Sequence, residues 1–153
     1  NILLTGHDAD FHTVYGPAPA ATFLGQAITF AMAGGGTGLV ALGDYSTAFT
    51  YLPAAWGITA VGGLVEETIT AITAAGAASG VFTGLTPADL SNWLNSYHAG
   101  FTAWDPRFVV YELGRRDGTH NVTLGYIVPE PGSLLLLGGA LLVLGGLRRF
   151  RKK

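Results

Sequence analysis

ILLTG, residues 2–6, is a short apolar run that ends at a glycine, and this pattern predicts a buried strand. Residues 20–33 then place apolar side chains at helical spacing, and a run of glycines ends that segment. GLVALGD, residues 38–44, predicts a second strand that ends in an acid. A strand, a helix and a strand in this order predict a right-handed crossover between two parallel strands.

The rest of the body continues this alternation up to residue 128. The predicted elements are strands at residues 58–64 and 80–85, helices at residues 65–75 and 86–101, and a hairpin of residues 107–113 and 121–128. Segment 86–101 gives the strongest helical signal, because its apolar side chains recur at i, i+3, i+4, i+7 and i+11. The sequence therefore predicts a three-layer α/β domain over residues 1–128, with helices flanking a mostly parallel sheet and a β-hairpin at its C-terminal end. A separate hydrophobic helix is expected in a second unit, residues 129–153.

Charge divides the chain into an acidic body and a basic end. All ten acidic residues lie within residues 1–130, where only three arginines oppose them, so this part carries a formal charge of −7. Five of the last six residues are cations. A body without a basic patch does not suit the phosphate backbone, so no nucleic acid partner is expected.

The chain contains no cysteine, which excludes disulfides, thiolate metal sites and a cysteine nucleophile. It begins at Asn1 rather than at a methionine, and residues 2–5 are too short for the apolar core of a signal peptide. Either a leader was removed or the sequence is a fragment, so an export signal is expected but is not visible in these residues.

The C-terminal segment has an apolar run with three alternative interpretations. Residues 134–147 contain no polar side chain, and these 14 residues would span about 21 Å as a helix, short of the roughly 30 Å of a membrane core. A buried core helix is disfavoured, because a body of this size cannot enclose a helix that is apolar on all sides. A permanent membrane anchor and a removable sorting signal remain as alternatives, and the cations after the run favour a cytoplasmic end for either.

Three features in fixed order at the C-terminus carry a resemblance to a known family. They are the Pro129, Glu130 and Pro131 motif, the apolar run, and the basic tail of Arg148, Arg149, Arg151, Lys152 and Lys153. Together they resemble the PEP-CTERM protein-sorting signal of Gram-negative bacteria. The resemblance implies export, retention in the inner membrane by the C-terminal helix, and processing near the motif by an exosortase, a membrane enzyme that resembles cysteine transpeptidases. It further implies a later location at the cell surface or outside the cell, in association with extracellular polysaccharide and biofilm matrix.

A polar loop directly after the first predicted strand is the main candidate site of the body. GHDADFH, residues 6–12, lies at the strand edge where open α/β sheets bind ligands. Its imidazoles and carboxylates suit a divalent metal or an acid–base pair, but the spacing matches no zinc signature, and solvated or loop-capping roles are the alternative. The candidate ligand or metal residues are His7, Asp8, Asp10, His12, Asp44 and His98.

Motifs of common enzyme classes are absent from the sequence, which contains no GxSxG, HExxH or Walker loop. The strand-first pattern is loosely similar to amidotransferase-like and flavodoxin-like domains, but the former need a cysteine that this chain lacks. We therefore expect an exported protein whose body binds or has a structural role, with no cofactor assigned. The alternative is a secreted hydrolase-like enzyme that uses His7, Asp8, Asp10 and His12, with or without a metal.

Overall fold

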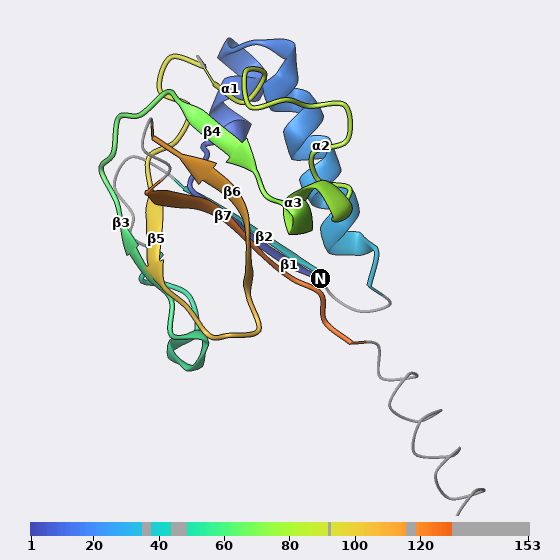
Figure 1. Cartoon of the computed structure of the whole chain (residues 1–153), viewed down its shortest axis with the longest axis vertical. Helices are drawn as coiled ribbons and strands as arrows, with labels where there is room; N and C mark the ends of the chain where they lie inside the picture. The colour runs from blue at the N-terminus through green and yellow to red at the C-terminus, as the bar shows by residue number, and fades with distance from the viewer. Residues whose placement is uncertain (35–37, 44–48, 92, 116–118, 130–153) are drawn as a thin grey trace, which may run out of the picture.

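The computed structural model of the chain describes residues 1–34, 38–43, 49–91, 93–115 and 119–129. Seven strands, three α-helices and one short 3₁₀ helix follow one another in this part of the chain (Figure 1). The strands are β1 (Ile2–Thr5), β2 (Leu39–Leu42), β3 (Thr59–Val61), β4 (Ile69–Ile72), β5 (Gly100–Ala103), β6 (Val109–Gly114) and β7 (His120–Tyr126). The helices are α1 (Ala9–Tyr15), α2 (Ala18–Met32), α3 (Ala74–Ala78) and the 3₁₀ helix η1 (Ala54–Trp56).

The predicted parallel pairing of the first two strands is confirmed. β1 and β2 pair in parallel, with Ile2 opposite Leu39, and α2 connects them. The buried side chains of α2 recur every three or four residues and face the sheet. They are Ala20, Phe23, Ala27, Phe30 and Ala31.

The expectation of a mostly parallel sheet is wrong for the strands that the structure describes. Every described pair other than β1 with β2 is antiparallel, so the domain is a mixed α/β fold with a curled sheet. The hairpin of β6 and β7 is confirmed, but β7 lies at the centre of the sheet, between β6 on one side and β1 and then β5 on the other. The reason is that no long helix follows β2 in the described residues, and parallel neighbours need a long crossover whereas antiparallel ones do not.

Segment 65–75 forms a strand and a short helix instead of the predicted single helix. β4 occupies Ile69–Ile72 and α3 begins only at Ala74, where the Thr73 hydroxyl accepts a hydrogen bond from the Gly76 N–H at 3.0 Å. The sequence TITAIT places five β-branched residues within residues 68–73, and their restricted side chains favour a strand. Glu66 and Glu67, which would favour the first turn of a helix at 65–75, therefore lie in the loop that precedes β4.

Two further predicted elements, the strand at 80–85 and the helix at 86–101, are replaced by turns that lead into β5. Gly80 and Gly84 adopt positive φ angles of 83° and 72°, which ends any strand there. Leu94 and Asn95 also have positive φ, which no α-helix allows, and the Ser96 hydroxyl donates to the Glu67 carbonyl at 3.2 Å. A capping contact does form at the start of the predicted helix, because the Thr86 N–H donates to the Asp89 carboxylate at 2.8 Å. Long-range hydrogen bonds nevertheless override the helical pattern of the residues that follow.

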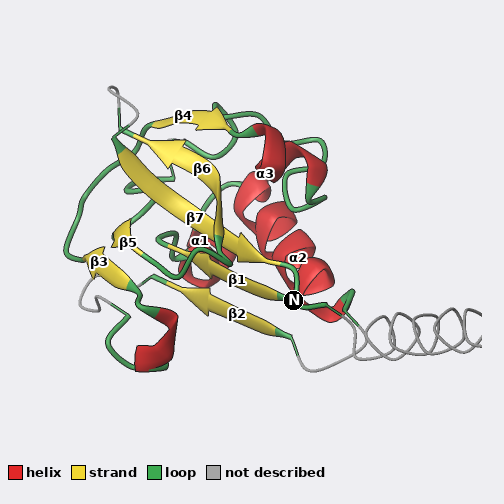
Figure 2. Cartoon of the chain, turned by 60° about the horizontal axis from the view of Figure 1, so that its bottom comes forward, coloured by secondary structure: helices red, strands yellow, loops and turns green. Residues whose placement is uncertain are grey.

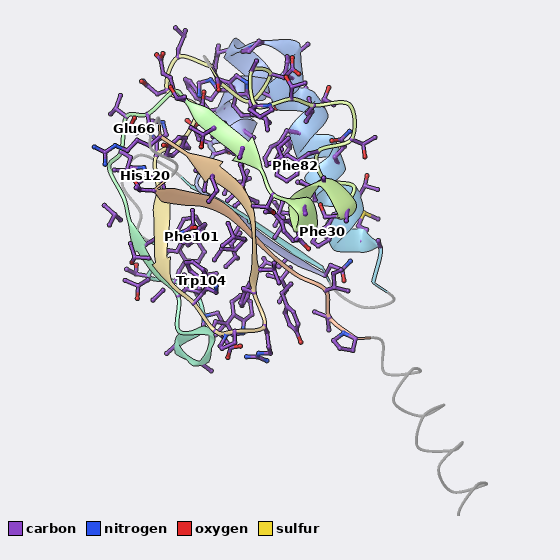
Figure 3. All side chains as sticks on the ribbon, in the orientation of Figure 1. Phe30, Glu66, Phe82, Phe101, Trp104 and His120 are labelled. Atoms are coloured by element: carbon purple, nitrogen blue, oxygen red, sulfur yellow. The ribbon has the colours of Figure 1, made fainter. Side chains whose placement is uncertain are left out.

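The three α-helices lie to one side of the sheet, so the predicted arrangement with α-helices on both faces is wrong for the described residues (Figure 2). α2 packs with Leu3, Tyr111 and Val122 in one buried cluster. The opposite cluster is built around aromatic side chains, and η1 contributes the half-buried Trp56 there. Figure 3 shows Phe30 and Phe82 on the side of α2 and α3, away from Phe101 and Trp104.

The apolar run at 134–147 and the basic tail lie outside the described residues. In the part of the chain that the structure does describe, no helix has the length and apolar character needed to cross a membrane.

Candidate functional site

The candidate loop 6–12 is partly helical, and its polar side chains point in different directions. Gly6 to Asp8 connect β1 to α1, so Asp10 and His12 lie on the first turns of that helix. His7 is buried in the core, Asp8 and His12 come together with His98, and Asp10 is exposed. Asp44 lies outside the described residues. The six candidates therefore do not converge on one centre in the described structure.

His7 forms a fully buried pair with Glu112 of β6. Both side chains have no exposed surface, and the His7 Nε2 atom lies 3.0 Å and 3.1 Å from the two carboxylate oxygens. The other ring nitrogen, Nδ1, hydrogen-bonds to the carbonyl of Ser96. The ring also stacks at a tilt against Trp93, with 4.9 Å between centroids. Both ring nitrogens of His7 are thus engaged by groups of the protein itself.

Two threonines complete this network across three strands. Thr123 lies opposite both Thr5 and Glu112 in the sheet. Its hydroxyl donates to the Glu112 carboxylate at 2.5 Å, so it must accept from the Thr5 hydroxyl, 2.9 Å away. Thr5 in turn accepts from the backbone N–H of His7 at 3.3 Å. The resulting chain of hydrogen bonds ends on the Glu112 side chain, so every polar group of this network has a partner.

The environment of His7 raises its pKa above the ordinary value of 6.5. Burial alone lowers the pKa, but the charge and hydrogen bond of Glu112 and the hydrogen bond to the Ser96 carbonyl outweigh it, with a further contribution from Asp8. Both ring nitrogens face oxygen acceptors, and only the imidazolium form can donate to both of them. The geometry and the direction of the pKa shift therefore both indicate that the His7 imidazole is protonated and carries a positive charge.

This raised pKa predicts that the folded state becomes less stable as the pH increases. A group whose pKa is higher in the folded state contributes its full stabilisation below the unfolded value of 6.5, and this contribution is lost as the pH rises through the folded pKa. Urea unfolding of the full chain at several pH values above 6.5 measures the effect, with a His7→Gln variant as the reference. We expect the free energy of unfolding of the wild type to fall relative to that of the variant, and a rise over the same range would contradict the assignment.

A second cluster places Asp8 between two imidazoles near the surface. The Nε2 atom of His12 lies 3.1 Å from one carboxylate oxygen, and the Nε2 atom of His98 lies 3.2 Å from the other. His12 also hydrogen-bonds at 3.0 Å to the carbonyl of Asn95, and His98 at 2.7 Å to that of Leu64. Because the His12 N–H is directed at the Asn95 carbonyl, its close contact with Asp8 is not a second aligned hydrogen bond.

The backbone beside this cluster is strained. Leu94 has a φ of 64° and Asn95 a φ of 87°, a region that leucine rarely occupies. This conformation brings the Asn95 carbonyl to His12 and leaves the Leu94 side chain 78% exposed. Strain of this kind is maintained only where surrounding contacts hold it, and here the Ser96 hydroxyl accepts from the Trp93 N–H at 3.1 Å.

Asp8 is expected to stabilise the connection between α1 and the segment that precedes β5. The Asp8→Asn change keeps the side-chain shape but removes the charge that both imidazoles face, so we expect a loss of about 1–3 kcal/mol in the free energy of unfolding. Asp10→Asn makes the same chemical change on an exposed side chain two residues away and should cost less than about 0.5 kcal/mol. Urea unfolding followed by tryptophan fluorescence compares the two, and equal small effects would contradict this role of Asp8.

A divalent metal is one of the alternatives for the candidate residues. No group of three or more histidine, aspartate or glutamate side chains in the described ranges has an arrangement that could hold a metal ion. The donors of the two clusters are also divided between separate partners, since His7 contacts Glu112 whereas His12 and His98 contact Asp8.

Sequence reasoning missed Glu112, Thr5 and Thr123, the partners that explain His7. One signal was present, because Glu112 is a single acid within the apolar strand RFVVYEL. A charged residue in a strand that is otherwise apolar indicates either an exposed face or a buried partner. The partner itself is 105 positions away, beyond the reach of any local pattern.

The described body ends close to the sorting motif predicted from the sequence. β7 ends at Tyr126, and Ile127 and Val128 connect it to the Pro129, Glu130 and Pro131 motif. Ile127 is 62% exposed, so the surface of the body next to the motif in sequence includes an apolar side chain.

Comparison with known protein families finds one match, to the PEP-CTERM protein-sorting motif, over residues 128–152. Comparisons of the chain with curated proteins and with solved structures give no match. The matched residues include the motif, the apolar run and all but the last residue of the basic tail, which are the features that carried the resemblance. The chain therefore carries a PEP-CTERM protein-sorting motif at residues 128–152, which implies an exported protein with an exosortase as its processing partner.

Proposed function

We propose that the protein is held in the inner membrane by its C-terminal segment until an exosortase processes it, and that its body then acts at the cell surface or in the extracellular matrix. In this proposal residues 1–128 form the extracytoplasmic domain and residues 129–153 the removable sorting signal. The match at residues 128–152 supports the route. The proposal includes an association of the body with extracellular polysaccharide, which is supported only by the family resemblance.

We further propose that the body binds or has a structural role rather than catalysing a reaction. The observation that carries this proposal is the burial of His7, whose side chain has no exposed surface and whose ring nitrogens are both engaged. A general base must reach the proton that it removes from a substrate, and this imidazole cannot. The alternative of a hydrolase-like enzyme would have to rely on Asp8, His12 and His98, whose polar atoms are directed at one another or at backbone carbonyls.

Fractionation of cells that express the full chain tests the proposed route. In cells with an exosortase, the body should appear in the surface and extracellular fractions. In otherwise identical cells without the enzyme, it should remain with the inner membrane. The same distribution in both strains would refute the proposal.

A further inference from the structure

A groove opens on the surface of the body beside the point where the chain leaves it. A pocket of about 370 Å³ lies between α3 and the adjoining parts of β6 and β7, and a second pocket of about 280 Å³ adjoins it. The two share Ala78, Ser79 and Ile127, so they form one continuous depression. We call it the exit groove. Figure 2 shows α3 alongside β6 on this part of the molecule.

Close packing around Tyr111 holds the walls of the exit groove in place. A Cβ atom added at Gly125 would lie 2.0 Å from the Tyr111 ring, so the absence of a side chain there lets the ring lie against the β7 backbone. A Cβ atom at Gly76 would lie 2.2 Å from the Tyr111 carbonyl oxygen, which shows how closely α3 approaches β6. The Thr73 hydroxyl fixes the same approach by donating to the Val110 carbonyl at 2.8 Å. A depression with such fixed walls is formed before any partner arrives.

The lining of the groove is suited to an apolar side chain. Ala75, Val109 and Ile127 supply aliphatic surface, and Val109 and Ile127 are both exposed. Arg107 contributes the only charge among the lining residues of the larger pocket. Its guanidinium is bound to Asp105 at 2.8 Å and lies 5.6 Å from the centre of the Tyr126 ring. The larger pocket of the groove thus offers an apolar floor with a neutralised cation at its rim, and the smaller pocket is lined partly by the polar residues Asn1, Gln26 and Thr29.

Covalent geometry places this groove next to the sorting motif. Glu130 follows Ile127 by three residues, and three residues reach at most about 11 Å even when fully extended. A protein–protein interface of ordinary size covers about 800 Å² on each partner, which corresponds to a disc about 16 Å in radius. An enzyme that binds the motif with such a footprint therefore reaches Ile127, which lines the exit groove.

We propose that the exit groove is a second contact site for the exosortase, which inserts an apolar side chain there while it holds the Pro-Glu-Pro motif. This inference rests on the proposed processing by exosortase. The groove adjoins the part of the chain that the enzyme binds, which is the motif. This proximity favours the exosortase over other partners as the protein that occupies the groove. Binding energy at the groove would add to that of the short motif and favour this protein over other chains that carry a similar motif.

Two pairs of variants test the proposal by the rate at which the tail is removed in membranes that contain exosortase. Ala78→Arg places a long side chain in the groove, and Ala77→Arg is its control, because Ala77 is an exposed neighbour in α3 that does not line either pocket. Val109→Glu places a charge on the groove wall, and Val61→Glu is its control at a similarly exposed position in β3. We expect roughly ten-fold slower processing for each groove variant and less than two-fold change for each control.

The outcomes separate this inference from the proposed function. If the wild type is processed and both groove variants are processed at its rate, the second contact site does not exist. Equal slowing of processing in the groove variants and in their controls would also overturn the proposal. So would a change in oligomeric state with unchanged processing, because that result would assign the groove to a second copy of this chain. Failure of the wild type to be processed at all would refute the proposed function instead. Circular dichroism of each full-length variant establishes that it folds. Because the two groove substitutions are unrelated, the test remains valid if one of these variants fails to fold.

Discussion

Replacing His7 by leucine should lower the free energy of unfolding by roughly 3–5 kcal/mol. The change removes the imidazolium and leaves the carboxylate of Glu112 buried with no compensating charge. Domains of this size have a total stability of about 5–15 kcal/mol, so the loss is large enough to shift the unfolding transition strongly. Urea unfolding of the full chain measures it, and the fluorescence of Trp93, which stacks on His7, reports directly on this part of the core.

A double variant distinguishes a paired charge from simple loss of packing. If the cost comes from an unpaired buried charge, the double variant with leucine at both His7 and Glu112 should be more stable than the two single effects predict when added. His120→Leu is a control, because this histidine is half-buried and its ring bonds to the Tyr97 hydroxyl at 3.2 Å rather than to a carboxylate. That control should cost no more than about 1.5 kcal/mol. Additive effects of the two leucine substitutions would show that His7 and Glu112 do not act as a pair.

Replacing Glu130 by alanine should slow removal of the C-terminal tail by roughly 30-fold or more. Glu130 is the only charged residue of the Pro-Glu-Pro motif, and loss of one partner from a desolvated charge pair at an interface costs about 2–5 kcal/mol. The mass of the protein from cells with exosortase gives the processed fraction over time. Glu67→Ala removes an exposed glutamate from the body and should be processed at the wild-type rate. Equal processing of both variants would show that the enzyme does not use the Glu130 carboxylate.

The elements that the sequence predicts well are those whose signals are local. The β1, α2 and β2 unit forms as expected, because its apolar spacing and the glycines after the helix agree with the packing it adopts. The hairpin of β6 and β7 likewise follows from two apolar runs separated by a short polar segment. Its central position in the sheet was not predictable, since strand order depends on contacts between distant segments.

Segment 86–101 shows how a correct burial pattern can accompany a wrong backbone. Leu90, Trp93, Tyr97 and Phe101 are buried as the helical stripe predicts, but Leu94 is exposed and its φ is positive. The chain buries the same side chains through turns because Ser91 and Ser96 bond to the backbone near β4. Periodicity alone does not distinguish these two ways of reaching the core.

The candidate site was predicted in composition but not in arrangement. The sequence identifies His7, Asp8 and His12 as notable polar residues beside a strand, and His98 as a residue of the same edge. It does not show that His7 turns inward to Glu112 while Asp8 turns to His12 and His98, because those partners lie up to 105 positions away. The tail is the opposite case, since its motif, apolar run and cations are contiguous and are recognised from the sequence alone.

The intact mass of the mature protein tests the central claim, processing by exosortase, most directly. Mass spectrometry of the protein from cells with the enzyme should find a chain that ends near the Pro-Glu-Pro motif and lacks the apolar run and the basic tail. The protein from cells without the enzyme should retain Lys153. Identical masses that include the full tail in both strains would contradict the account.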